Sequence, residues 1–170
     1  MLCGSGLSSS LNLSGSIVRI SELLTIFASY RTNMTTSRTI WDPLRKKEVA
    51  LTPEEQVRQW CIRVLSEQMQ IPMHMMMSEV GFRLAGKQLR ADILVYDRSA
   101  RPLMVVECKR PEVALTQEVL DQAIRYNIVL EVKYMIITNG TKTFICRRNS
   151  NGFEFIDTVP TYTEMLCLQQ

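Results

Sequence analysis

The order of apolar and polar residues along the chain predicts a first helix and then three strands. Thr52 is typical of the residue before a helix, Pro53 of its first turn, and Glu55 of the residue that completes a capping box. Apolar residues then recur with helical spacing as far as Ile71, and Pro72 ends the helix. Three runs with the length and composition of strands come next, at 75–84, 89–96 and 102–109.

The second half of the chain predicts another helix and further strands. Pro111 ends the third strand, and apolar residues at helical spacing predict a helix from about Leu115 to Glu131. Strands are expected at 133–138, 141–147 and 153–155. Asn139-Gly140, between the first two of these, is typical of a hairpin turn. The elements therefore run helix, three strands, helix, strands, which is the order of an α/β (α+β) domain.

Charged residues interrupt the apolar pattern of two neighbouring strands. Glu107 and Lys109 close the run that starts at Leu103, and they lie on the same face as Leu103 because successive strand side chains point to opposite faces. Asp92 stands near the start of the preceding strand. Carboxylates in two strands joined by a hairpin, with a lysine beside them, favour a site for a divalent cation. Two plainer interpretations stay open, namely an exposed charge pair at a solvated strand end and an Asp92 carboxylate satisfied by a turn.

Length and charge limit the class of protein. A chain of 170 residues is long enough for one compact domain with its own core and too short for two. We expect an N-terminal arm that is in part disordered, a single domain and a C-terminal tail, at 1–39, 40–160 and 161–170. The net charge of +3 permits contact with a phosphate backbone without requiring it.

Cysteine and histidine usage excludes several kinds of site. Five cysteines without a C-x-x-C pair indicate small buried side chains in a reducing cytoplasm. A single histidine leaves too little material for a histidine-containing zinc site or a Ser-His-Asp triad. No apolar run reaches membrane-spanning length, and nothing resembles a nucleotide-binding P-loop. We expect a soluble cytoplasmic protein, with no motor domain in this chain.

An ordered set of short motifs runs from about residue 40 to residue 160. The set is Trp41-Asp42-Pro43-Leu44-Arg45-Lys46-Lys47, Leu51-Thr52-Pro53-Glu54-Glu55, Val57-Arg58-Gln59, Val106-Glu107-Cys108-Lys109 and Gln122-Ala123-Ile124-Arg125-Tyr126. It resembles the N-terminal nuclease-type domain of type I restriction enzyme R subunits, and more closely the short bacterial proteins that carry this domain alone. Such domains belong to the PD-(D/E)xK nuclease superfamily. The resemblance implies a restriction-endonuclease-like αβββαβ core, with a mixed sheet flanked by helices.

The same resemblance implies a catalytic site for phosphodiester hydrolysis. Asp92, Glu107 and Lys109 take the catalytic positions. Asp92, Glu107 and the main-chain carbonyl of Cys108 would hold Mg²⁺ (or Mn²⁺). Lys109 would hold or help to deprotonate the attacking water. A further acidic metal ligand often stands on the first helix, where Glu54 takes the position by its helical face, and favourable charge at a helix N-terminus is the alternative for Glu54.

Four more residues are candidates for contact with DNA. Gln122 and Tyr126 match the Q-x-x-x-Y motif of type I restriction subunits and lie one helical turn apart. A solvated glutamine and a core tyrosine are the alternatives for this pair. Arg58 and Arg110 are candidates for phosphate contact, with ordinary surface arginine as the alternative.

The resulting hypothesis is a Mg²⁺-dependent endodeoxyribonuclease related to the restriction subunit of type I restriction-modification systems. Its expected partners are DNA and restriction-modification or motor subunits, and not a membrane. The alternative is a non-catalytic module of the same fold that binds nucleic acid or a protein partner. A complete D…ExK set favours the nuclease, whereas the weak basic charge keeps the binding module open.

Overall fold

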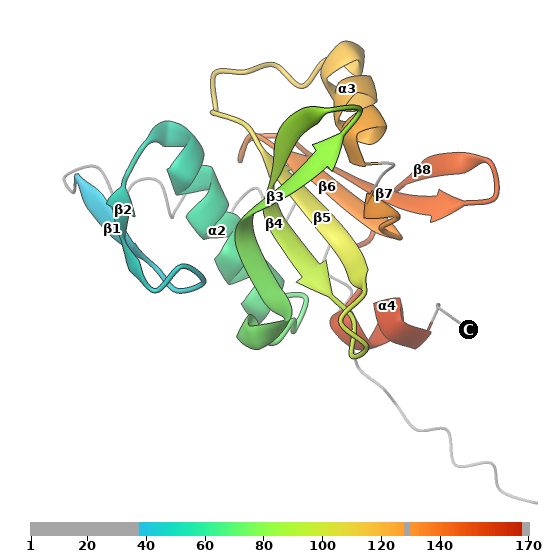
Figure 1. Cartoon of the computed structure of the whole chain (residues 1–170), viewed down its shortest axis with the longest axis horizontal. Helices are drawn as coiled ribbons and strands as arrows, with labels where there is room; N and C mark the ends of the chain where they lie inside the picture. Colours follow the sequence, from blue (N-terminus) through green and yellow to red (C-terminus); the bar gives the residue numbers. More distant parts are fainter. Residues whose placement is uncertain (1–37, 128–129, 168–170) are drawn as a thin grey trace, which may run out of the picture.

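The computed structural model describes residues 38–127 and 130–167, without the side chains of Leu84, Tyr126 and Asn127 (Figure 1). The elements in chain order are β1 (Thr39–Asp42), β2 (Lys47–Ala50), α2 (Pro53–Glu67), the 3-10 helix η1 (Met73–Met75), β3 (Met76–Leu84), β4 (Lys87–Tyr96), β5 (Pro102–Cys108), α3 (Gln117–Asn127), β6 (Tyr134–Thr138), β7 (Thr143–Asn149), β8 (Gly152–Ile156) and α4 (Tyr162–Cys167). None of the helices within these ranges is long and apolar enough to cross a membrane. The expected arm lies outside the described residues up to residue 37.

Six strands form one mixed sheet in the order β3-β4-β5-β6-β7-β8. Strands β5 and β6 are parallel, and the other neighbouring strands are antiparallel. A parallel pair needs a crossover connection, which contains α3. The order α2-β3-β4-β5-α3-β6 is the expected αβββαβ order, so the predicted fold class is confirmed. Strands β1 and β2 form a separate hairpin beside α2 (Figure 1).

Two apolar clusters, one with α2 and one with α3, cover the two faces of the sheet. Residues of β5 alternate between them, because Met104 and Val106 belong to the cluster with α2 and Val105 to the cluster with α3. Helix α2 contributes Trp60 and Leu65, each 1% exposed. Full burial of one such side chain stabilises a fold by about 1.5–3 kcal/mol. This packing fixes α2 against the sheet, and with it the polar residues of the first turns of α2.

The turn between β4 and β5 is held by the carboxylate of Asp97. Its oxygens accept hydrogen bonds from the backbone N–H groups of Ser99 and Arg101, at 2.8 and 2.9 Å, and from Arg101 Nε at 2.9 Å. Burial alone would raise the pKa of Asp97, but the hydrogen bonds from Arg101 and Ser99 outweigh it and lower that pKa below its ordinary value. An ionised Asp97 therefore stabilises the hairpin that sets the register of β4 against β5.

We expect Asp97→Ala to lower the free energy of unfolding by about 1–3 kcal/mol, because the backbone N–H groups of Ser99 and Arg101 and the Arg101 side chain lose a charged acceptor. The folded-state pKa lies below the model-compound value of 3.8. The contribution is therefore fully present above that value and is lost as the pH falls through the folded-state pKa. Urea unfolding at neutral pH and in acid measures both effects. A difference between wild type and variant that stays constant down to low pH would contradict this role.

Several element boundaries differ from the predicted ones by a few residues, for example those of α2, α3 and β5. Helix α2 ends at Glu67 rather than near Ile71, and α3 begins at Gln117 rather than near Leu115. Strand β5 ends at Cys108, one residue before the predicted end. Periodicity fixes the existence of an element better than its ends, since terminal turns fray and residues just outside an element often continue its pattern.

Two features were not predicted from the pattern. The strands of the β1–β2 hairpin have four residues each and α4 has six, so neither gives a clear periodic signal. The expected tail at 161–170 contains α4, whose Tyr162 and Met165 are 6% and 0% exposed in the cluster with α2. The Tyr162 hydroxyl also donates a hydrogen bond to the carbonyl of Tyr96, at 3.0 Å. This part of the expected tail therefore packs in the core.

Candidate active site

The β4–β5 hairpin brings Asp92 close to the end of β5. The paired register of the two strands runs from Tyr96 and Pro102 to Ile93 and Val106, and Asp92 and Glu107 are the next residue of each strand beyond the last pair. The backbone N–H of Cys108 donates a hydrogen bond to Asp92 Oδ2, at 2.6 Å. This bond ties Asp92 to the residue that lies between Glu107 and Lys109 in the sequence.

A third carboxylate, which the sequence did not single out, lies on the other side of Asp92. Glu79 of β3 stands between two residues that pair with Ile93 and Ala91, the two neighbours of Asp92, so Glu79 and Asp92 oppose each other. Glu79 Oε2 lies 2.6 Å from Arg90 Nε. Its φ of +59° falls in the left-handed region, which is uncommon for a residue with a side chain. Positions 79 and 92 therefore form a row of two carboxylates across neighbouring strands.

Arg58 of α2 reaches into this row from the first helix. Its Nη2 lies 2.6 Å from Asp92 Oδ1 and 2.7 Å from Glu79 Oε1, and its Nη1 lies 2.5 Å from Glu55 Oε2. The residue is 5% exposed. Burial alone would lower the pKa of Arg58, but the charge of Asp92, its hydrogen bond and the charge of Glu55 raise that pKa above its ordinary value. The guanidinium is a buried, permanently charged cation on Asp92.

The β1–β2 hairpin adds a second arginine to the network. Arg45 Nη2 lies 2.5 Å from Glu55 Oε1, which also accepts a hydrogen bond from Gln59 Nε2 at 2.9 Å. Arg45 Nε pairs with the buried carboxylate of Asp42. Hydrogen bonds from Arg45 and Leu44, with the charge of Arg45, outweigh the effect of burial and lower the pKa of Asp42. Glu55 thereby links the hairpin to Arg58.

Of the two glutamates at the start of α2, Glu55 has different surroundings from those predicted. Thr52 Oγ1 accepts the backbone N–H of Glu55 at 3.1 Å, as expected of an N-cap. The predicted capping box does not form, because the N–H of Thr52 donates to the carbonyl of Ala50 and the Glu55 carboxylate points into the ion-pair network. Glu54 has a side chain 43% exposed, 3.9 Å from Arg58 Nη2, at the rim of the network.

The described ion-pair network holds more carboxylates than cations. The guanidinium groups of three arginines face four carboxylates, those of Asp42, Glu55, Glu79 and Asp92. Glu54 adds another carboxylate at the rim. An excess of negative charge in a partly buried place favours the binding of an additional cation.

Residues 53–160 match the family described as type I restriction enzyme R protein N terminus. The chain belongs to this family. A solved fragment described as an HsdR subunit of a type I restriction enzyme from Vibrio vulnificus YJ016 is 27% identical to it. That match covers 53% of this chain and 18% of the other, with a TM-score of 0.39. A comparison with curated proteins finds no match.

The other residues predicted for the site of this R-protein N-terminal domain differ in their burial and in their contacts. Lys109 is half-buried, and its backbone N–H donates to the carbonyl of Thr138 at 2.8 Å. Arg110 and Gln122 are exposed, the latter on α3. Tyr126 lies on the same helix, with its side chain outside the described part of the chain. Arg58, predicted to contact DNA, is instead buried among carboxylates.

The thiol of Cys108 belongs to the core of the R-protein N-terminal domain. Its Sγ lies 3.8 Å from Sγ of Cys61, and both residues are buried with free thiols. The hydrogen bond with Cys61 and burial raise the pKa of Cys108 well above its ordinary value. Since only the thiolate is a good metal ligand, the main-chain carbonyl is the better donor that Cys108 can offer.

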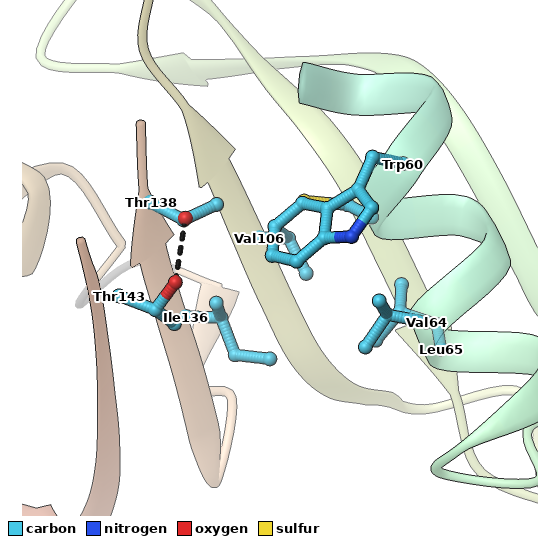
Figure 2. A pocket seen from close by; sticks show the side chains of 8 residues that line it. Trp60, Val64, Leu65, Val106, Ile136, Thr138 and Thr143 are labelled. Atoms are coloured by element: carbon cyan, nitrogen blue, oxygen red, sulfur yellow. Dashed lines mark hydrogen bonds between the residues drawn. The ribbon is translucent and has the colours of Figure 1, made fainter. Parts of the chain in front are cut away.

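A small cavity behind this strand is part of the core and not a substrate pocket. It lies between α2 and strands β5, β6 and β7 (Figure 2). Its lining is Trp60, Cys61, Val64, Leu65, Val106, Ile136, Thr138 and Thr143. The hydroxyls of Thr138 and Thr143 are hydrogen-bonded to each other at 2.7 Å. A volume of about 10 Å³ has room for at most about one water molecule, so no nucleotide fits.

Oxygen donors of the kind that Mg²⁺ prefers are present in the R-protein N-terminal domain, although they are engaged by protein groups. No set of three or more His, Cys, Asp or Glu side chains in 38–127 and 130–167 is arranged to hold a metal ion. Asp92 Oδ1 contacts Arg58 and Oδ2 accepts from Cys108 N–H. Protein Mg²⁺ sites commonly use one or two carboxylates with water and substrate phosphate, so Asp92 would be open to such an ion only once Arg58 leaves Oδ1.

Proposed function

We propose that this domain is a Mg²⁺-dependent nuclease that hydrolyses DNA phosphodiester bonds. The observation that carries the proposal is the contact between Asp92 and the end of β5, where Asp92 Oδ2 accepts the N–H of Cys108, the residue between Glu107 and Lys109. This arrangement occurs in a chain that belongs to the R-protein N-terminal family of type I restriction enzymes. The excess of carboxylates around Asp92 supports a cation there.

The residues have distinct roles in this proposal. Asp92, Glu107 and the carbonyl of Cys108 would hold Mg²⁺ or Mn²⁺, and Glu54 would approach from the rim. The ion would neutralise phosphate charge and lower the pKa of bound water. Lys109 would orient the attacking water and offset charge in the transition state.

We also propose DNA as the substrate and subunits of a restriction-modification system as partners, including a motor subunit, in the cytoplasm. Gln122 and Arg110 are exposed, and so both are available to a large ligand. Tyr126 keeps its proposed place with Gln122 through the Q-x-x-x-Y spacing. Arg58 is a weaker candidate for phosphate contact, because its guanidinium is buried and ion-paired.

The second candidate function is a non-catalytic binding module. The occupation of Asp92 Oδ1 by Arg58 favours it, because an arginine on this carboxylate neutralises it without a metal. The two candidates differ in a simple respect. Only the nuclease requires a divalent cation at Asp92.

Cleavage of plasmid DNA tests the proposal directly. We expect the wild-type protein to nick or linearise DNA in Mg²⁺ or Mn²⁺, and we expect EDTA to stop the reaction. Asp92→Asn, nearly equal in size, should lose cleavage together with the Mn²⁺-induced rise in melting temperature. The matched control is Glu154→Gln, which neutralises an exposed carboxylate paired with Arg147 at 2.6 Å. DNA binding without cleavage or any Mn²⁺ effect would favour the binding module.

A further inference from the structure

The nitrogens of the buried Arg58 guanidinium differ in their number of partners. Two carboxylates, Asp92 and Glu79, share the single nitrogen Nη2, at 2.6 and 2.7 Å. Nε, in contrast, is buried and has no hydrogen-bond partner among the described residues. A buried donor without a partner is unfavourable, because no hydrogen bond compensates for the water that it loses. The guanidinium is therefore not held by a fully satisfied set of contacts on Asp92.

The backbone conformation of Glu79 is unfavourable for a residue with a side chain. Its φ of +59° interrupts a nine-residue strand in a conformation that disfavours side chains. The strained backbone sits directly across from Asp92, and Arg90 Nε holds the second carboxylate oxygen at 2.6 Å. Strain of this kind is concentrated at functional sites. The geometry keeps a fixed carboxylate next to the Arg58–Asp92 pair.

We propose that Arg58 is an internal cation that occupies Asp92 in the metal-free domain and is received by Glu79 when a divalent cation takes Asp92. This inference rests on the metal site proposed above. Glu55 contacts the other terminal nitrogen, Nη1, at 2.5 Å. One end of the guanidinium is therefore held by a contact that does not depend on Asp92. Arg58 and Glu79 are thus positioning residues, and neither is a metal ligand in this scheme.

The two residues act on metal affinity in opposite directions. A divalent cation must displace Arg58 from Oδ1, and the fraction of molecules with a free Asp92 reduces the apparent affinity in proportion. Glu79 lowers the cost of displacement, because it leaves Nη2 with a carboxylate at 2.7 Å once Arg58 has left Asp92. Without Glu79 the buried charge would depend on Glu55 at Nη1 and on Glu54, which is 3.9 Å away at the rim. Removal of Arg58 should therefore tighten metal binding, and removal of Glu79 should weaken it.

Calorimetric titration with Mn²⁺ tests the proposal without DNA. We expect Arg58→Met to bind Mn²⁺ about tenfold more tightly and Glu79→Gln about tenfold more weakly than wild type, which is roughly 1.4 kcal/mol each. Arg58→Lys, which keeps the charge, should stay closer to wild type than Arg58→Met. In the double variant Arg58→Met/Glu79→Gln the effect of Glu79→Gln should disappear. Glu154→Gln is the control and should bind Mn²⁺ as wild type does.

Each contrary outcome identifies a different error. Unchanged affinity in Arg58→Met and Glu79→Gln, with Mn²⁺ binding that depends on Asp92, would overturn this inference and leave the metal site standing. Absence of Mn²⁺ binding in wild type and Arg58→Met alike would overturn the metal site, and the inference with it. A full effect of Glu79→Gln in the Arg58→Met background would make Glu79 a direct contributor to the ion's field and overturn its role as the receiver of Arg58. If Arg58→Met does not fold, the weaker binding expected of Glu79→Gln still decides the matter.

Discussion

Lys109→Ala should reduce DNA cleavage by about 100-fold or more while it leaves the affinity for Mn²⁺ nearly unchanged. The reason is that Glu107, near the end of β5, and Lys109, just after it, have different proposed roles. In the proposed site Asp92 and Glu107 would hold the ion, whereas the ammonium group of Lys109 would act on water and on developing charge. The backbone of Lys109 is tied to Thr138 at 2.8 Å, so the substitution removes the side chain from a fixed position. Plasmid cleavage under single-turnover conditions and Mn²⁺ titration measure the two properties separately.

Lys142→Ala provides the matched control for the loss of a lysine. Lys142 is exposed, with its ammonium group 4.8 Å from the ring centroid of Phe144, and it stands outside the proposed site. Cleavage should be close to the wild-type rate in this variant. A similar loss in both variants would mean that the lysines act only through general attraction to DNA. Wild-type cleavage by Lys109→Ala would remove Lys109 from the catalytic group.

The proximity of Asp92 to the end of β5 was predictable because it depends on local chemistry. Two apolar runs flank a short polar turn, and the chain between them is too short for anything other than a hairpin. The turn residue Asp97 then fixes the register through hydrogen bonds within four residues of itself. The family match confirms the relation to R-protein N termini, and the resemblance was visible in the same motifs.

The place of Glu79 beside Asp92 was not predicted, because the sequence around Glu79 contains no distinctive motif. It stands at an ordinary polar position of a strand, and its positive φ has no signature in a residue other than glycine. A signal was nevertheless present in the turn at Gly86. Counting back from the pair Leu84–Lys87 in antiparallel register places position 79 opposite Asp92.

The burial of Arg58 was not predictable from helical periodicity. Its partners Glu79 and Asp92 lie 21 and 34 positions away in the sequence, and only the packing of α2 on the sheet brings them together. Arginine is usually exposed, so a local pattern assigns it to the surface. The capping box failed for a similar reason, because the N–H of Thr52 is taken by Ala50 in the preceding segment.

Glu55→Gln should lower the free energy of unfolding by about 3 kcal/mol, near the lower end of the range for one member of a buried ion pair. The side chain is 7% exposed and accepts from Arg45, Arg58 and Gln59. The loss is limited because both arginines keep another carboxylate, Asp42 for Arg45 and Asp92 for Arg58. Urea unfolding of the metal-free protein measures the change.

Glu54→Gln is the control one position away, and it should change stability by less than about 0.5 kcal/mol. Its carboxylate is 43% exposed and 3.9 Å from Arg58 Nη2, so water screens the pair. If Glu55 acted only as a helix cap, its replacement would cost about 1 kcal/mol, and the N-cap bond from its own N–H to Thr52 would survive the substitution. A loss of that size or smaller would show that the network around Arg58 contributes little to stability. A loss near 3 kcal/mol would show that Glu55 holds Arg58 in place, as the exchange between Asp92 and Glu79 requires.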